Sequence, residues 1–128
     1  MIILIDTSTA ECRLSIVDED RTIEYNWDAG RSLARDLLGY LRDRLGEQGA
    51  TFHDISGIGV MKGPGSFTGL RIGLAVINTL ADSLTIPVVG EMGEYWRDDA
   101  LRRLAEGQDD RIVLPVYGAD AHITKPRK

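Results

Sequence analysis

The hydrophobic pattern of this chain changes its period near residue 32, and this change limits the folds that it can adopt. Residues 2–5 are continuously apolar, residues 12–17 alternate between apolar and polar, and residues 22–27 indicate a third strand. From Ser32 onward, leucines recur at the three- and four-residue spacing of an amphipathic helix. Since only short turns separate the first three segments, we expect an antiparallel meander that leads into a helix.

Beyond this helix the pattern alternates between strands and helices. Helical crossovers make consecutive strands parallel to one another. We therefore expect an α/β fold: a single lobe of the ribonuclease-H/actin (ASKHA) type, with a mixed five-stranded sheet and helices packed on its faces. The pattern predicts strands over 55–61, 86–89 and 112–117, and helices over 66–84 and 91–106.

Composition and charge exclude several classes of protein. With 43% hydrophobic and 27% charged residues, the chain matches soluble globular proteins. Its apolar runs are too short for a signal peptide or a membrane span, so we expect a cytoplasmic protein with no membrane partner. The net charge of −5 leaves little basic surface for nucleic acid, apart from Lys125, Arg127 and Lys128. Any contact with RNA would therefore depend on a partner.

The side chains that metal or hydrolytic chemistry requires are sparse. The single cysteine, Cys12, excludes an internal disulfide, and His53 and His122 lie far apart with no thiol nearby. A nuclease of this fold would need several carboxylates around two metal ions, but residues 55–61 end without an acidic residue. Ser66 has no evident base. We expect no catalytic residue, no metal site and no cofactor in this chain.

A glycine-rich loop leaves the strand at 55–61 and opens the next helix, where backbone N–H groups can hold an anion. It is not a P-loop, because Leu70 stands where the lysine would be, nor a dinucleotide fingerprint, because Thr68 replaces the third glycine. Two interpretations stay open: an anion-binding loop, and a tight turn whose glycines allow positive φ or close approach. The residues of this motif are Gly63, Pro64, Gly65, Ser66, Thr68, Gly69 and Gly73.

A second polar segment follows the first strand and comprises Asp6, Thr7, Ser8 and Thr9. Actin-like ATPases contact phosphate with a turn at this place. The alternative is a turn closed by its own side chains. An actin-like nucleotide-binding or ATP-hydrolysing protein would use this turn together with residues 63–65.

The helix predicted at 66–84 carries apolar side chains around about half of its circumference, whereas a surface helix needs an apolar stripe only somewhat wider than ~100°. Either the sheet and the first helix cover all of it, or the surplus docks onto another protein. In the second case, an aspartate at Leu37 or Leu74 would break the complex without unfolding the lobe. The expected interface comprises Leu33, Leu37, Leu41, Leu45, Phe67, Leu70, Arg71, Leu74, Ile77 and Leu80.

Three segments, in order, resemble the TsaB (YeaZ) family. Residues 63–73 resemble its signature, residues 3–9 its first strand and turn, and residues 115–117 with 123–126 its end. The resemblance implies half of an actin-like fold that pairs with the related protein TsaD. With the ATPase TsaE, the two proteins serve N6-threonylcarbamoylation of adenosine 37 in tRNA.

For this chain, the resemblance implies a non-catalytic scaffold or activator subunit, not an enzyme, that contacts TsaD through the helices at 32–45 and 66–84. ATP and metal would belong to the partner subunits, and tRNA would be reached indirectly. Typical members continue into a second lobe; here residues 1–106 would form the lobe and 107–128 a short strand and a basic tail. Residues 76–78 are Val-Ile-Asn where Ala-Lys-Gly is usual. A homodimer without a dedicated partner remains a further alternative.

Overall fold

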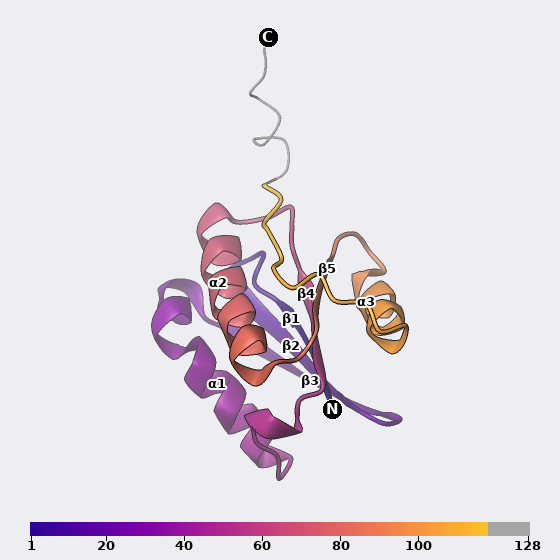
Figure 1. Ribbon diagram of the computed structural model, residues 1–128. Helices are drawn as coiled ribbons and strands as arrows, with labels where there is room; N and C mark the ends of the chain where they lie inside the picture. Colours follow the sequence, from indigo (N-terminus) through magenta and orange to yellow (C-terminus); the bar gives the residue numbers. More distant parts are fainter. Residues whose placement is uncertain (118–128) are drawn as a thin grey trace.

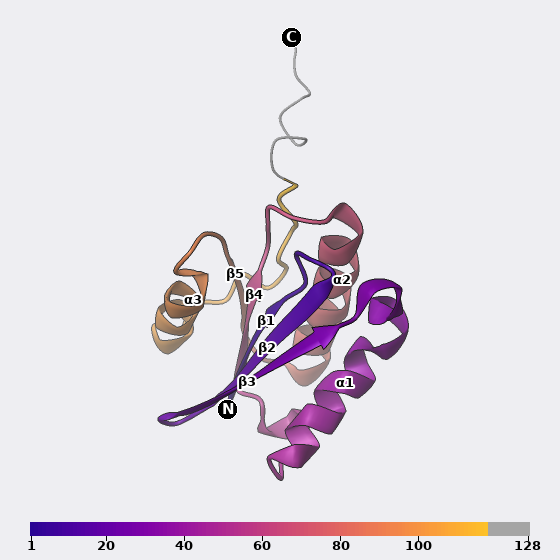
Figure 2. The same ribbon diagram turned by 180° about the vertical axis from the view of Figure 1, so that it is seen from behind.

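The computed structural model describes residues 1–117 and places one sheet between two helical layers (Figure 1). Helices α1 (Leu33–Glu47) and α2 (Phe67–Leu84) cover one face of the sheet. Helix α3 (Trp96–Ala105) covers the other face, which is also evident from behind (Figure 2). Two short 3-10 helices, η1 (Gly30–Ser32) and η2 (Phe52–Asp54), connect these elements.

The sheet has five strands in the order β3-β2-β1-β4-β5. Strands β1, β2 and β3 form the antiparallel meander, whereas β4 pairs parallel to both β1 and β5. This confirms the predicted mixed five-stranded sheet, with the crossovers made by helices. The strands are β1 (Ile2–Asp6), β2 (Glu11–Asp18), β3 (Arg21–Asp28), β4 (Gly57–Met61) and β5 (Val88–Glu91).

Residues 2–5 of strand β1 are apolar because both faces of the strand are covered. Ile3 and Ile5 join the larger core beneath α1 and α2, whereas Leu4 joins a smaller core beneath α3. Cys12 lies in the larger core, and this burial raises the pKa of its thiol to about 12. On the opposite face, α3 can approach closely because a Cβ at Gly59 would overlap Ala100.

The ends of two helices differ from the prediction. At the first helix, η1 precedes α1, and the side chain of Ser32 makes no capping hydrogen bond. The third helix begins at Trp96 instead of residue 91, because β5 continues to Glu91 and Gly93 adopts a φ of 91°. Helix α2 begins as expected, with Ser66 Oγ accepting a hydrogen bond from Gly69 N at 3.2 Å.

The strand predicted at 112–117 is wrong, since these residues join no sheet. The reason lies at the free edge of β5, where carboxylates take the place of a neighbouring strand. Val88 N donates to Asp109 Oδ1 at 3.1 Å, and Gly90 N donates to Asp110 Oδ2 at 2.9 Å. Residues 109–117, called the strap below, then leave the sheet and run along α2 (Figure 1). The predicted basic tail and His122 lie outside the described residues.

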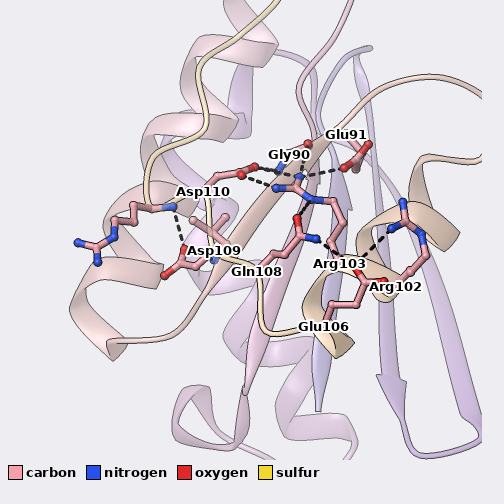
Figure 3. Close-up of polar contacts among 10 residues, drawn as sticks. Gly90, Glu91, Arg102, Arg103, Glu106, Gln108, Asp109 and Asp110 are labelled. Atoms are coloured by element: carbon pink, nitrogen blue, oxygen red, sulfur yellow. Dashed lines mark hydrogen bonds and ion pairs between the residues drawn. The ribbon is translucent and has the colours of Figure 1, made fainter.

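Arg103 of α3 holds the start of the strap in place (Figure 3). Its guanidinium donates to both carboxylate oxygens of Asp110 and, at 2.9 Å, to Glu91. The hydrogen bond from Arg103 lowers the pKa of the Asp110 carboxyl below its usual value. The closure of the β5 edge therefore depends on an ionised Asp110.

This ion pair predicts a specific loss of stability in acid. Because the pKa of Asp110 is lower in the folded chain than in the unfolded chain, its stabilising contribution is complete above the ordinary aspartate pKa of about 4. This contribution is lost as the pH falls through the pKa that Asp110 has in the folded chain. We expect the free energy of unfolding, measured in urea between pH 3 and pH 7, to fall less steeply in Asp110→Asn than in the wild type.

The matched control for this titration is Asp98→Asn, which removes an exposed carboxylate on α3 that lies away from the strap. It should follow the wild-type curve. Equal curves for the wild type and Asp110→Asn would show that the ion pair contributes nothing to folding.

Candidate functional site

The glycine-rich loop and the turn at residues 6–9 lie against each other. A Cβ at Gly65 would overlap Ser8, and a Cβ at Gly69 or Gly73 would overlap Thr7. Thr7 itself is completely buried. The glycines therefore serve a close approach of two backbone segments, which confirms that interpretation of the motif.

Hydrogen bonds join the same two segments. Ser8 donates to Asp6 Oδ1 through its backbone N, at 2.8 Å, and through its Oγ, at 2.6 Å. Thr7 Oγ1 donates to Gly69 O at 3.0 Å, and Ser66 N donates to Ser8 O at 2.7 Å. These donors, which a phosphate could otherwise use, are engaged within the chain. The outer rim, with Thr9, Pro64 and Thr68, is exposed.

The start of the loop is also the place where the strap docks. Gly63 adopts a φ of 129° and lies directly against the carbonyl of Val116, so a side chain there would be excluded. Val116 N donates to Lys62 O at 2.7 Å. The loop thus joins the turn on one side and the strap on the other.

The two helices do not leave the predicted apolar surface uncovered. Eight of the ten residues predicted for the interface are buried inside the chain, and only Phe67 and Arg71 are exposed. The reason is that α1 and α2 lie side by side on the sheet and cover each other. The prediction that an aspartate at Leu37 or Leu74 would break the complex without unfolding the lobe is therefore wrong. Both changes would disrupt the core. The buried residues are Leu33, Leu37, Leu41, Leu45, Leu70, Leu74, Ile77 and Leu80.

A different apolar surface lies on the outer side of the same helix pair. A hollow of about 390 Å³ opens between α1 and α2, and Leu38, 47% exposed, forms one wall. The other wall comes from α2, with Ala75, Val76 and Thr79. Two sequence signals could have located it. Leu37 and Leu38 lie 100° apart on a helix, so both cannot face the sheet, and residues 72–81 contain no charged side chain.

Phe67 and Arg71 mark the end of this surface near the glycine-rich loop. The Phe67 ring is 54% exposed and lies against the ring of Tyr117, with centroids 4.6 Å apart. The guanidinium of Arg71 lies 5.0 Å from the centroid of the Phe67 ring. The first turn of α2 therefore presents an aromatic and cationic patch beside the strap.

Two other kinds of site receive no support within the described chain. No three acidic, histidine or cysteine side chains among residues 1–117 lie close enough to share a metal ion. None of the helices in that range is both long enough and apolar enough to cross a membrane.

Comparisons with known proteins place this arrangement in a family. A model described as "TsaD: tRNA N6-adenosine threonylcarbamoyltransferase" matches residues 27–91, a range that contains α1 and α2. The tRNA threonylcarbamoyladenosine biosynthesis protein TsaB of Escherichia coli (strain K12) is 30% identical over 93% of this chain and 54% of its own length. TsaB of Bacillus subtilis (strain 168) is 36% identical over 92% of this chain and 50% of its own.

A solved structure agrees with these relatives. YeaZ from Pseudomonas aeruginosa superimposes with a TM-score of 0.66 and 34% identity, over 71% of this chain and 43% of that one. The chain thus spans about half the length of the relatives it matches. The signature loop, the single actin-like lobe and these relatives agree, and the chain belongs to the TsaB (YeaZ) family.

Proposed function

We propose that this chain is a non-catalytic subunit in the formation of threonylcarbamoyladenosine in tRNA, and that it acts by pairing with a TsaD-type protein. The TsaB relatives are named for this biosynthesis. The glycine-rich loop has a structural role that needs no ligand, since it packs closely against the turn at 6–9 and is joined to it by the hydrogen bonds Ser66 N to Ser8 O and Thr7 Oγ1 to Gly69 O. A scaffold function is consistent with both observations.

The observation that carries the proposal is the hollow between α1 and α2. It is lined mainly by apolar atoms of Leu38, Ala75 and Val76, on a helix face without charge from residue 72 to residue 81. Burial of such a surface contributes roughly 25 cal/mol per Å². Because residues 27–91 match the TsaD model, a TsaD-type protein has a counterpart of the same helix pair. Two related helix pairs can pack ridge into groove.

The remaining components are assigned from the charge of the chain and from its family resemblance. A net charge of −5 disfavours direct binding of tRNA, so tRNA would be held by the partner. In this proposal the TsaD-type partner performs the transfer, and a TsaE-type ATPase completes the assembly. ATP and any metal ion would be bound by those subunits.

Pairing is tested by a charge placed on the outer side of α2. We expect Ala75→Arg to weaken binding of the TsaD-type protein from the same organism at least a hundredfold, because a guanidinium would be buried without a partner. Ala105→Arg, the same change at an exposed position on α3, should bind like the wild type. Co-elution in size-exclusion chromatography and isothermal calorimetry measure the effect. Undiminished binding by Ala75→Arg would refute the proposed surface.

The role in tRNA modification is tested in the cell. Deletion of the gene should abolish threonylcarbamoyladenosine in nucleoside digests of tRNA, and the wild-type gene should restore it. The Ala75→Arg gene should not restore it, whereas the Ala105→Arg gene should. Normal levels of the nucleoside after deletion would contradict the proposed function.

A further inference from the structure

A second hollow lies on the other side of α2, between this helix and the strap. It has a volume of about 460 Å³. The wall from α2 includes Arg71, Ala75 and Asn78, and the wall from the strap includes Leu114 and Tyr117. Leu114 is 71% exposed, which is high for a leucine whose backbone neighbours are fixed in place.

The strap is fixed on both sides of Leu114. The side-chain amide of Asn78 donates to Val113 O at 3.0 Å and accepts from Val113 N at 2.9 Å. The Val113 side chain is buried and lies directly against Gly90. Val116 N then donates to Lys62 O at 2.7 Å. With these anchors, Leu114 is held above the hollow at little further cost in conformational entropy.

One ridge of α2 separates the two hollows. Arg71, Ala75 and Thr79 are spaced four residues apart and are all exposed, so they form one row along the helix. Ala75 lines both hollows. The small side chains of Ala75 and Thr79 allow another helix to approach, and each hollow can then receive side chains from one flank of that helix. Leu38 forms the outer wall of the first hollow, and Leu114 forms part of the outer wall of the second.

We propose that the strap is the second wall of the partner-binding site, with Leu114 in direct contact with a helix of the TsaD-type partner and Asn78 as a positioning residue. This inference rests on the proposed function, because the partner is assigned by continuity across Ala75 with the surface already described. The strap lies outside residues 27–91, which match the TsaD model, so it adds a feature that the shared helix pair does not supply.

The test compares two exposed apolar residues of the strap. We expect Leu114→Ser to weaken binding of the TsaD-type protein about tenfold to a hundredfold in calorimetry, whereas Ile112→Ser should bind within about twofold of the wild type. Ile112 is 64% exposed but does not line the second hollow. Circular dichroism should show unchanged thermal unfolding for both variants.

Asn78→Ala supplies the test of positioning. If Asn78 acts by holding Leu114, then Asn78→Ala should also weaken binding, and the double variant Asn78→Ala with Leu114→Ser should be no weaker than Leu114→Ser alone. An effect of Asn78→Ala that adds fully to that of Leu114→Ser would overturn the positioning role.

The outcomes separate this inference from the proposed function. If the wild type binds the partner and Leu114→Ser binds equally well, the inference fails and the proposed function stands. If the wild type does not bind the partner, both fail. Light scattering of the isolated chain tests whether a second copy of the chain occupies the second hollow instead. If the wild type is a dimer, and Leu114→Ser loses the dimer but keeps its affinity for the TsaD-type partner, the inference is also overturned.

Discussion

Leu37→Asp is expected to unfold the protein, whereas Leu38→Asp, one residue further, is expected to leave it folded. Leu37 is 0% exposed, and an aspartate there would lose the packing of the leucine and bury a carboxylate without a partner. A cost of about 4–5 kcal/mol or more is comparable to the total stability of a small domain. Leu38 is 47% exposed, so its carboxylate would stay in water.

Far-UV circular dichroism and urea denaturation distinguish the two variants. Leu38→Asp should retain the wild-type spectrum and a free energy of unfolding within about 1 kcal/mol of the wild type. It should nevertheless lose binding to the TsaD-type partner, since Leu38 forms a wall of the first hollow. A folded Leu37→Asp variant would mean that α1 is held far less tightly than its burial indicates.

Gly73→Ala is expected to destabilise the fold by about 3 kcal/mol, although alanine is the better helix former. A Cβ at Gly73 would overlap the side chain of Thr7, which is itself completely buried. Relief would require α2 to move away from the turn at residues 6–9, which would stretch the hydrogen bond from Thr7 Oγ1 to Gly69 O.

Gly46→Ala is the matched control for this prediction. Gly46 also lies inside a helix, but a Cβ there would meet nothing within 4 Å. We expect this change to stabilise the protein by up to about 1 kcal/mol, through helix propensity and a less flexible unfolded chain. Thermal unfolding should therefore shift in opposite directions for the two variants. A stabilising shift in both would show that α2 does not press against Thr7.

Much of the fold could be predicted because its signals are local. The alternation at residues 12–17 and the leucine spacing after Ser32 each depend on the period of one element, and the structure confirms the meander and α1. The close approach at the glycine-rich loop could also be anticipated, since glycine permits it. The partner of that approach, Thr7, could not, because it lies more than sixty residues earlier in the chain.

The candidate surface was harder to predict because burial depends on which elements meet. An apolar arc on α2 shows that much of the helix is covered, but it does not show what covers it. Helix α1 and the sheet cover Leu74 and Ile77, whereas Val76 and Ala75 remain on the outer side. The apolar pattern of residues 112–117 indicates a strand, but the strap is anchored by side chains such as Asp110 and Asn78 rather than by a strand ladder.

Asn78 illustrates how a departure from a family pattern can gain a physical explanation. It stands where the family resemblance leads one to expect glycine, which has no side chain to reach the strap. Here its amide forms both hydrogen bonds of a backbone partner with Val113. A side chain on a helix thus completes the backbone of a segment that no strand accompanies.

The two ends of the sheet differ in how they resist polymerisation. An open edge can template the addition of strands from other molecules, which is the first step toward fibres. At the β5 end, Asp109 and Asp110 occupy the N–H groups that an incoming strand would need. At the β3 end the edge carries the exposed charges of Arg21, Glu24 and Asp28. Hydrogen bonds thus occupy the edge at β5, and charged side chains disfavour strand addition at the edge of β3. Together they confine the sheet to five strands.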